Sequence, residues 1–379
     1  MKTALVIHPY LSVYAGGEVV ALHVINALHR AGYHVSIFSD VADVEEARKF
    51  YPEVGDALAK ADHVTLSIRK RITMLPGMRM LNMAQSERLI YRMLEDLQPD
   101  VAFSTQSSIF TMNHHTRLVH FTYDFSDLFV FSPFTRMRDW RPDLEKLKFR
   151  TFFAYTEGRR LMRIATRRMF GIAKPHPDLI ATPSSLVLKI LQTHGYKNST
   201  TFVPPARNFK PKAKIPQVIQ VARIVQAKRL EIFFEAARRL PDVPFVLIGR
   251  RQEGAAKYGE KLLSHLPRNV EFLEGNLKDY ADRLQESSIY CYTGRDRAIM
   301  LTVPEGISAG CYPIVSGDSS ALDVANIARI GSCFFTIEQL VSQLKDRLAS
   351  PLDPYEISKY AEPFRPEHFE EWVQKVAQL

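Results

Sequence analysis

The chain has 379 residues, of which 46% are hydrophobic and 24% are charged, a balance that fits a globular protein and excludes an intrinsically disordered one. This length predicts two domains. The formal net charge of +9 indicates an anionic partner, which could be nucleic acid, an acidic lipid surface or a phosphorylated substrate. Three cysteines without disulfide-framework or zinc-site spacing favour a reducing compartment. No apolar run is long enough for a membrane-spanning helix, and no signal peptide is expected at the N-terminus.

The first half of the chain alternates predicted strands with helices. A strand at 3–7 leads through a loop into a helix at 18–30, which Gly32 should end. The remaining strands are predicted at 35–38, 64–66, 101–103, 117–121 and 179–182. Strands that are apolar on both faces are typical of a parallel sheet covered by helices.

A proline-rich segment at 204–216 interrupts this alternation and predicts a linker. The second alternation has predicted strands at 218–221, 245–248, 270–273, 289–292, 312–315 and 332–335. Its helices are predicted at 229–240, 280–286, 303–309 and 337–348, and the tail should form two more. The sequence therefore predicts an α/β fold with two doubly wound parallel-sheet domains, at 1–205 and 206–354, followed by helices at 355–379.

Ligands of such sheets bind at the carboxyl ends of the strands, and two facing domains would form a cleft. Gly16 and Gly17 precede a helix, where the backbone could approach a phosphate, although a structural turn explains them equally well. The dinucleotide pattern GxGxxG and the P-loop pattern GxxxxGK[ST] are both absent from this loop.

Four further residues follow or end predicted strands. Arg223 and Lys228 could neutralise a diphosphate, or they could be solvated surface cations. Glu305 could accept hydrogen bonds from vicinal ribose hydroxyls, or it could simply favour the start of a helix. His120 could reach into a cleft, or it could be a satisfied core histidine. No metal-ligand spacing and no hydrolase or metalloprotease motif occurs.

The positive charge is concentrated in the first half of the chain. Residues 133–174 contain twelve basic and four acidic residues, with large apolar groups interleaved, and 68–81 is a second basic and apolar segment. Such segments are typical of contacts with a membrane surface, although a long surface helix with a solvated basic face also explains them. Nucleic acid is the weakest interpretation, because no RNA- or DNA-binding motif is present.

Several motifs in this order resemble glycosyltransferase family 4, whose members have the GT-B fold. Residues 16–18 lie where the family has its glycine-rich loop. The segment from Val221 to Lys228 resembles the family's "GR-x4-K" arrangement, with Ala222 in place of glycine. The run from Glu305 to Val315 resembles "E-A-M-A-x-G-x-P-V-V" with one extra residue, and 362–369 resembles the tail that returns to the first domain. The strings at 8–10 and 119–124 are most similar to mannosyltransferases that extend polyprenol- or dolichol-linked oligosaccharides.

This resemblance implies a retaining transfer from a nucleotide-sugar donor without a metal ion or other cofactor. Arg223 and Lys228 would hold the leaving diphosphate, Gly16 and Gly17 would face the same phosphates, and His120 would position the sugar. Glu305 would bind the ribose. The remaining implied donor contacts are Asp296, Leu301 and Thr302.

One departure concerns the family's E-x7-E motif. Its first glutamate corresponds to Arg297, and Asp296 is the only adjacent acid, so the identity of the donor sugar stays open. We expect a glycosyltransferase, with mannose favoured, that acts on a lipid-linked or membrane-proximal glycan. It should be cytoplasmic and bind the membrane face through 68–81 and 133–174. A catalytically impaired nucleotide-sugar-binding subunit and a soluble enzyme with a small sugar or polyol acceptor are the alternatives.

Overall fold

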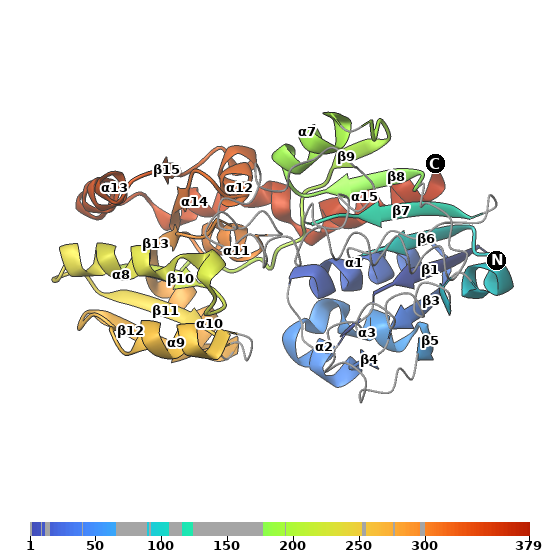
Figure 1. Cartoon of the computed structure of the whole chain (residues 1–379), viewed down its shortest axis with the longest axis horizontal. Coiled ribbons are helices and arrows are strands. Elements are labelled where there is room, and N and C mark those ends of the chain that lie inside the picture. The colour runs from blue at the N-terminus through green and yellow to red at the C-terminus, as the bar shows by residue number, and fades with distance from the viewer. Residues whose placement is uncertain are drawn as a thin grey trace, which may run out of the picture. The chain divides into compact units, whose positions relative to one another are not determined.

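The computed structural model describes residues 2–8, 10–11, 16–39, 41–65, 89–90, 92–105, 116–123, 177–193, 195–251, 255–275, 277–295 and 300–379. The chain divides into two compact units. The first contains Met1–Pro183, Val187–Phe202 and Trp372–Leu379, and the second contains Ser184–Leu186 and Val203–Glu371. Each unit has its own parallel sheet (Figure 1).

Within the described residues, the first unit has a sheet of seven parallel strands in the order β5-β3-β1-β6-β7-β8-β9. Their bounds are Thr3–Ile7 (β1), His34–Ser39 (β3), Asp62–Thr65 (β5), Val101–Ser104 (β6), Arg117–Phe121 (β7), Leu179–Thr182 (β8) and Ser199–Thr201 (β9). Two short strands, β2 (Tyr10–Leu11) and β4 (Val41–Ala42), pair separately.

The helices of this unit include α1 (Gly16–Arg30), α2 (Val44–Phe50), α3 (Pro52–Ala59) and α7 (Ser185–Thr193). Helix α1 ends in a Schellman motif, because Gly32 has a φ of 80° and the amide of Tyr33 donates to the carbonyl of Leu28 over 3.0 Å. Gly32 therefore ends the helix as predicted. Helices α2, α3 and α7 were not predicted.

The second unit has, among the described residues, six parallel strands in the order β12-β11-β10-β13-β14-β15. Their bounds are Ile215–Val221 (β10), Phe245–Gly249 (β11), Val270–Glu274 (β12), Ser287–Tyr292 (β13), Tyr312–Ser316 (β14) and Ser332–Phe334 (β15). Its helices are α8 (Leu230–Arg239), α9 (Ala256–Leu263), α10 (Leu277–Glu286), α11 (Thr302–Ser308), α12 (Ala321–Ala328), α13 (Ile337–Ala349) and α14 (Pro354–Lys359). Two short 3₁₀ turns, Gln226–Lys228 and Glu362–Phe364, complete it.

Alternate residues of these strands pack on opposite faces of the second sheet. Val218 belongs to the cluster that includes side chains of α8, α9 and α13, and the next residue, Ile219, belongs to the cluster that includes α10, α11, α12 and α14. Ile289 and Tyr290 of β13 divide in the same way. The sheet is therefore covered on both faces, as its continuous apolar strands predicted.

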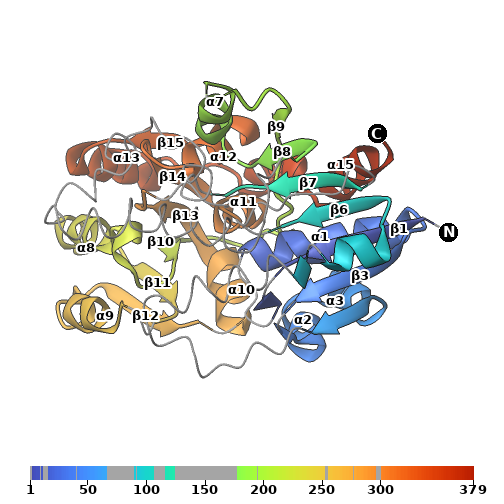
Figure 2. The same ribbon diagram turned by 45° about the vertical axis from the view of Figure 1, so that its right-hand side comes forward.

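The final helix, α15 (Pro366–Gln378), contributes its last turns to the first unit, where it runs near β7 and β8 (Figures 1 and 2). The Trp372 ring packs edge-on against Phe121 at 6.0 Å, and the Tyr33 hydroxyl donates to the Ala377 carbonyl over 3.0 Å. The C-terminal helix returns to the first domain, as the resemblance implied.

Some observed boundaries differ from the predicted ones. The predicted linker at 204–216 ends two residues early, because Ile215 already begins β10 despite the proline that follows. Helices α9 and α12 were missed. The basic segments 68–81 and 133–174, together with Asp296 and Arg297, lie outside the described residues. Among the helices of the described residues, none is long and apolar enough to cross a membrane.

Candidate functional site

Both sheets follow the doubly wound strand order, with one switch point where the direction of winding reverses. In the first unit this point lies between β1 and β6, and in the second it lies between β10 and β13. Ligands of this fold bind beyond the carboxyl ends of the strands at the switch point. The residues that follow these four strands are therefore the first place to search for a site.

In the second unit the loop after β10 carries three cations, of which Arg223 and Lys228 are the predicted site residues. Arg223 is exposed and makes no ion pair with the described residues. The ammonium of Lys228 donates to the Tyr292 hydroxyl over 2.9 Å and lies 5.1 Å from the centre of that ring. Because Tyr292 ends β13, this contact joins the loop after β10 to the other side of the switch point.

The loop is also fixed through its backbone. Thr293, directly after β13, donates from its hydroxyl to the carbonyl of Lys228 over 2.9 Å and also contacts the buried amide of Gln220. The amide of Arg295 donates to the carbonyl of Ala227 over 2.9 Å. These bonds fix the position of Lys228 beside the switch point of the second sheet.

Glu305, on α11, is almost completely buried, with a side chain only 3% exposed. Arg207 donates from Nε to Oε1 over 3.0 Å, and Tyr280 donates from its hydroxyl to Oε2. Burial and, next, the charge of Glu305 raise the pKa of Tyr280 well above its usual range, so this phenol stays protonated as a donor. Each carboxylate oxygen keeps a second lone pair after accepting one bond.

Leu301 and Thr302 lie where α11 begins. Leu301 is buried, and the Thr302 hydroxyl lies 2.6 Å from the hydroxyl of Tyr290. Gly306 packs directly on the Tyr290 ring, since a Cβ at that position would lie 2.8 Å from it. The ring thus takes the space of a side chain and fixes the start of the helix.

In the first unit, buried polar groups gather at the carboxyl ends of β1, β6 and β7. His8 is fully buried, its Nδ1 lies 2.8 Å from the Thr105 hydroxyl, and its Nε2 lies 3.8 Å from Glu18. Gly16 and Gly17 are the first two residues of α1, which begins two residues before the predicted Glu18, and a Cβ at Gly17 would lie 3.7 Å from the His8 ring. The glycine loop therefore packs on the switch point of the first sheet.

His120, the fourth residue of β7, is completely buried. Burial lowers its pKa to about 3, so the imidazole is neutral at physiological pH and offers one donor and one acceptor. Neither ring nitrogen has a hydrogen-bond partner among the described residues. The Nε2 of His8 and the hydroxyl of Tyr123 lack one as well. Buried polar atoms are rarely left unpaired, so these groups are suited to a polar ligand.

The structure places Arg223, Lys228, Leu301, Thr302 and Glu305 in the second unit, and Gly16, Gly17 and His120 in the first. Sequence reasoning missed Arg207 and Tyr280, which hold the Glu305 carboxylate. It also missed the ion pairs between Asp318 and both Arg229 and Arg295. The one sequence signal for these ion pairs is that Arg295 and Asp318 each lie just after a predicted strand.

Among the residues that the structure describes, no group of three or more histidine, cysteine, aspartate or glutamate side chains could hold a metal ion.

Comparison with known proteins identifies the class to which this architecture belongs. Residues 205–363 match the family described as Glycosyl transferases group 1, which covers most of the second unit and every predicted site residue in it. None of the curated proteins matches the chain.

Solved structures extend the likeness to the whole chain. WaaG, a glycosyltransferase involved in lipopolysaccharide biosynthesis, is 13% identical with a TM-score of 0.67 over 98% of this chain and 99% of its own. Sucrose-phosphate synthase from Thermosynechococcus elongatus is 14% identical, with a TM-score of 0.67. The match covers 100% of this chain and 98% of the synthase chain. Anabaena Alr3699/HepE, solved in complex with UDP and glucose, is 11% identical with a TM-score of 0.63 over the full length of both chains.

The fold is therefore GT-B, with two Rossmann-like units, and the chain contains a glycosyltransferase group 1 domain. The match over residues 205–363 identifies the class as a glycosyltransferase.

Proposed function

We propose that this protein is a retaining glycosyltransferase that moves a sugar, with mannose favoured, from a nucleotide-sugar donor to a lipid-linked or membrane-proximal glycan. The observation that carries the proposal is the cationic loop after β10, which borders the switch point of the second sheet and lies inside the group 1 match. Alr3699/HepE has been solved with UDP-glucose, which supports a donor of this type.

The leaving group of the reaction would be a nucleoside diphosphate. As the glycosidic bond breaks, negative charge grows on the β-phosphate, and fixed cations lower the energy of that state. Arg223 is exposed and unpaired among the described residues, while Lys228 is held by Tyr292. These two cations would neutralise the diphosphate without a metal ion.

The ribose would bind Glu305. Arg207 and Tyr280 hold this carboxylate in one orientation, and the remaining lone pairs can accept hydrogen bonds from two vicinal hydroxyls. Asp296, Leu301 and Thr302 would line the same donor site. Arg207 and Tyr280 occupy one position on each oxygen, so the second lone pair of each oxygen would serve the ribose.

The sugar or the glycan acceptor would meet the polar groups of the first unit. The neutral ring of His120 and the phenol of Tyr123 are buried donors without partners among the described residues, and hydroxyl groups of a sugar match them. Gly16 and Gly17 would face the phosphates. The basic segments 68–81 and 133–174 would bind an anionic membrane that carries the acceptor, so the protein would be cytoplasmic and peripheral. These features agree with membership of glycosyltransferase family 4.

The test is a panel of UDP- and GDP-sugars incubated with polyprenol-phosphate-linked oligosaccharides, with product detected by mass spectrometry. We expect transfer from one donor, GDP-mannose first, and retention of the anomeric configuration. Absence of turnover and of any nucleotide-dependent thermal shift across the panel would refute the function.

The sequence at Arg297 favours a second candidate, a nucleotide-sugar-binding subunit that has lost catalysis. Donor binding without transfer, unchanged by Arg297→Glu, would support it. Flotation with anionic liposomes at low salt separates the membrane-bound enzyme from one that uses a soluble acceptor, since the latter would stay with the unbound fraction.

A further inference from the structure

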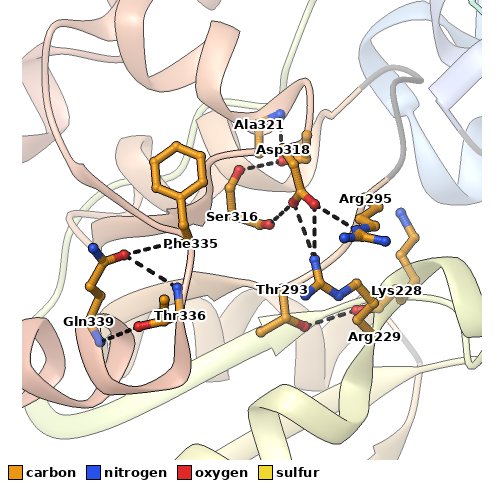
Figure 3. A network of polar contacts seen from close by, with 11 residues as sticks. Lys228, Arg229, Thr293, Arg295, Ser316, Asp318, Ala321, Phe335, Thr336 and Gln339 are labelled. Atoms are coloured by element: carbon orange, nitrogen blue, oxygen red, sulfur yellow. Dashed lines mark hydrogen bonds and ion pairs between the residues drawn. The ribbon is translucent and has the colours of Figure 1, made fainter. Parts of the chain in front are cut away.

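Asp318 lies just after β14 and joins three loops at the carboxyl edge of the second sheet (Figure 3). Its Oδ2 accepts from Nε of Arg295 over 2.6 Å, and its Oδ1 accepts from Nη1 of Arg229 over 3.2 Å. The Ser316 hydroxyl also donates to Oδ1. Burial alone would raise the pKa of Asp318, but the Ser316 and Arg295 hydrogen bonds and the charge of Arg229 outweigh it and lower that pKa. The carboxylate is therefore ionised.

Within this network one carboxylate faces two guanidinium groups, so the network has a net positive charge. Arg229 adopts the left-handed conformation with a φ of 49°, which is strained for a residue other than glycine. Its ion pair with Asp318 holds the backbone there, directly after Lys228. The chain thus retains a strained arginine where glycine would be easier, which points to a need for the charge or for the loop shape.

The two arginines differ in what they leave free. Arg229 contacts both carboxylate oxygens through Nη1 and is the more buried of the two. Arg295 uses only Nε, and neither of its Nη groups makes a hydrogen bond to the described residues. Its side chain is 46% exposed. A guanidinium fixed at Nε presents its two Nη groups in the geometry that grips a phosphate with two parallel bonds.

Arg295 also stands at the right place for the proposed donor. It follows β13 by three residues, while Arg223 follows β10 by two, and these strands flank the switch point. The backbone bond from Arg295 to Ala227 places the two loops side by side.

We propose that Arg295 is a further phosphate ligand of the donor site and that Asp318 is the positioning residue that orients it. This inference rests on the proposed function, because it assumes a nucleoside diphosphate in the crevice of the second sheet. In this arrangement Arg223 and Lys228 contact the diphosphate from the loop after β10, and Arg295 contacts it from the loop after β13. Asp318 keeps the Nη groups of Arg295 directed toward the diphosphate.

Calorimetric titration with UDP, GDP, ADP and dTDP, and with the corresponding nucleosides, tests the proposal. Arg295→Ala should weaken the tightest-binding diphosphate at least about tenfold, the loss of one charged hydrogen bond, and change nucleoside binding less than about twofold. Arg239→Ala is the matched control, because Arg239 ends α8 and pairs with Glu235 and Glu338 rather than with Asp318. It should change neither affinity.

A second variant tests the role of Asp318. Asp318→Asn should weaken diphosphate binding in the wild-type background and have no further effect beside Arg295→Ala, because it acts through that arginine. An effect transmitted through Arg229 would persist in the double variant and would refute the positioning role. If Arg295→Ala binds the diphosphate as the wild type does, the phosphate role is wrong although the proposed function survives. If the wild type binds none of the four diphosphates, both fail together.

Discussion

Replacing the buried His120 should change how the stability of the protein depends on pH. In the folded protein burial lowers the pKa of this imidazole to about 3, whereas in the unfolded chain it titrates near 6.5. Below pH 6.5 the unfolded state therefore binds a proton that the folded state does not bind. The stability contributed by the neutral ring is complete above pH 6.5 and is lost as the pH falls toward 3.

The magnitude follows from these two pKa values. Between pH 7.0 and pH 4.5 the linkage relation gives a loss of about 2.5 kcal/mol from this single group, before other groups are counted. His120→Gln keeps a buried polar side chain but cannot titrate, so it should remove that part of the pH dependence. The substitution also changes the free energy of unfolding at pH 7.0. The comparison therefore uses only the change in that free energy between pH 7.0 and pH 4.5.

Urea unfolding at pH 7.0 and pH 4.5, followed by circular dichroism, measures this difference. His34→Gln is the control, because His34 is partly exposed and pairs with Asp62 on the surface of the same unit. We expect the wild type and the control to lose about 2 to 3 kcal/mol more than His120→Gln on acidification. If all three proteins lose the same amount, His120 is not held neutral by burial and the reasoning is refuted.

Four further substitutions test the site and the packing beneath it. Arg223→Ala and Lys228→Ala should each lower kcat/KM by about 10²-fold or more in steady-state kinetics. For the exposed Arg223, urea titration should show a change in the free energy of unfolding of less than about 0.5 kcal/mol. Unchanged kinetics would mean that neither cation touches the donor. Tyr280→Phe removes a hydrogen-bond donor from the buried Glu305 carboxylate, so thermal unfolding should show a loss of about 2 kcal/mol in the free energy of unfolding. Nucleotide affinity should fall as well. An unchanged melting temperature would show that this hydrogen bond contributes nothing to stability. Gly249→Ala would bring a Cβ against the backbone carbonyl of Ala222, so low expression or a loss above about 3 kcal/mol is expected, and wild-type stability would contradict this packing.

The fold was largely predictable because continuous apolar strands alternate with helices throughout the chain. The strands at 3–7, 117–121 and 179–182 were predicted at their observed bounds, since turn residues or charges flank each of them. Helix α12 was missed because its sequence is apolar around most of its circumference and lacks the one-sided pattern of a surface helix.

The site was only partly predictable. Motif spacing located Arg223, Lys228 and Glu305, but the partners of these residues come from distant parts of the chain. Arg207 is 98 residues from Glu305, in a segment that reads as a linker, and Asp318 is 89 residues from Arg229. Such contacts depend on the register of the whole sheet, which a local sequence pattern does not predict.

The return of the C-terminal helix to the first unit has a consequence for synthesis. The second unit is almost continuous in sequence, from Val203 to Glu371, and can complete its core as soon as that stretch leaves the ribosome. The first unit begins earlier but buries Val373 and Val376 of α15, so its core stays open until the second unit has been made. The half synthesised first is therefore the half finished last, and its exposed sheet is the surface that a chaperone would have to protect in the interval.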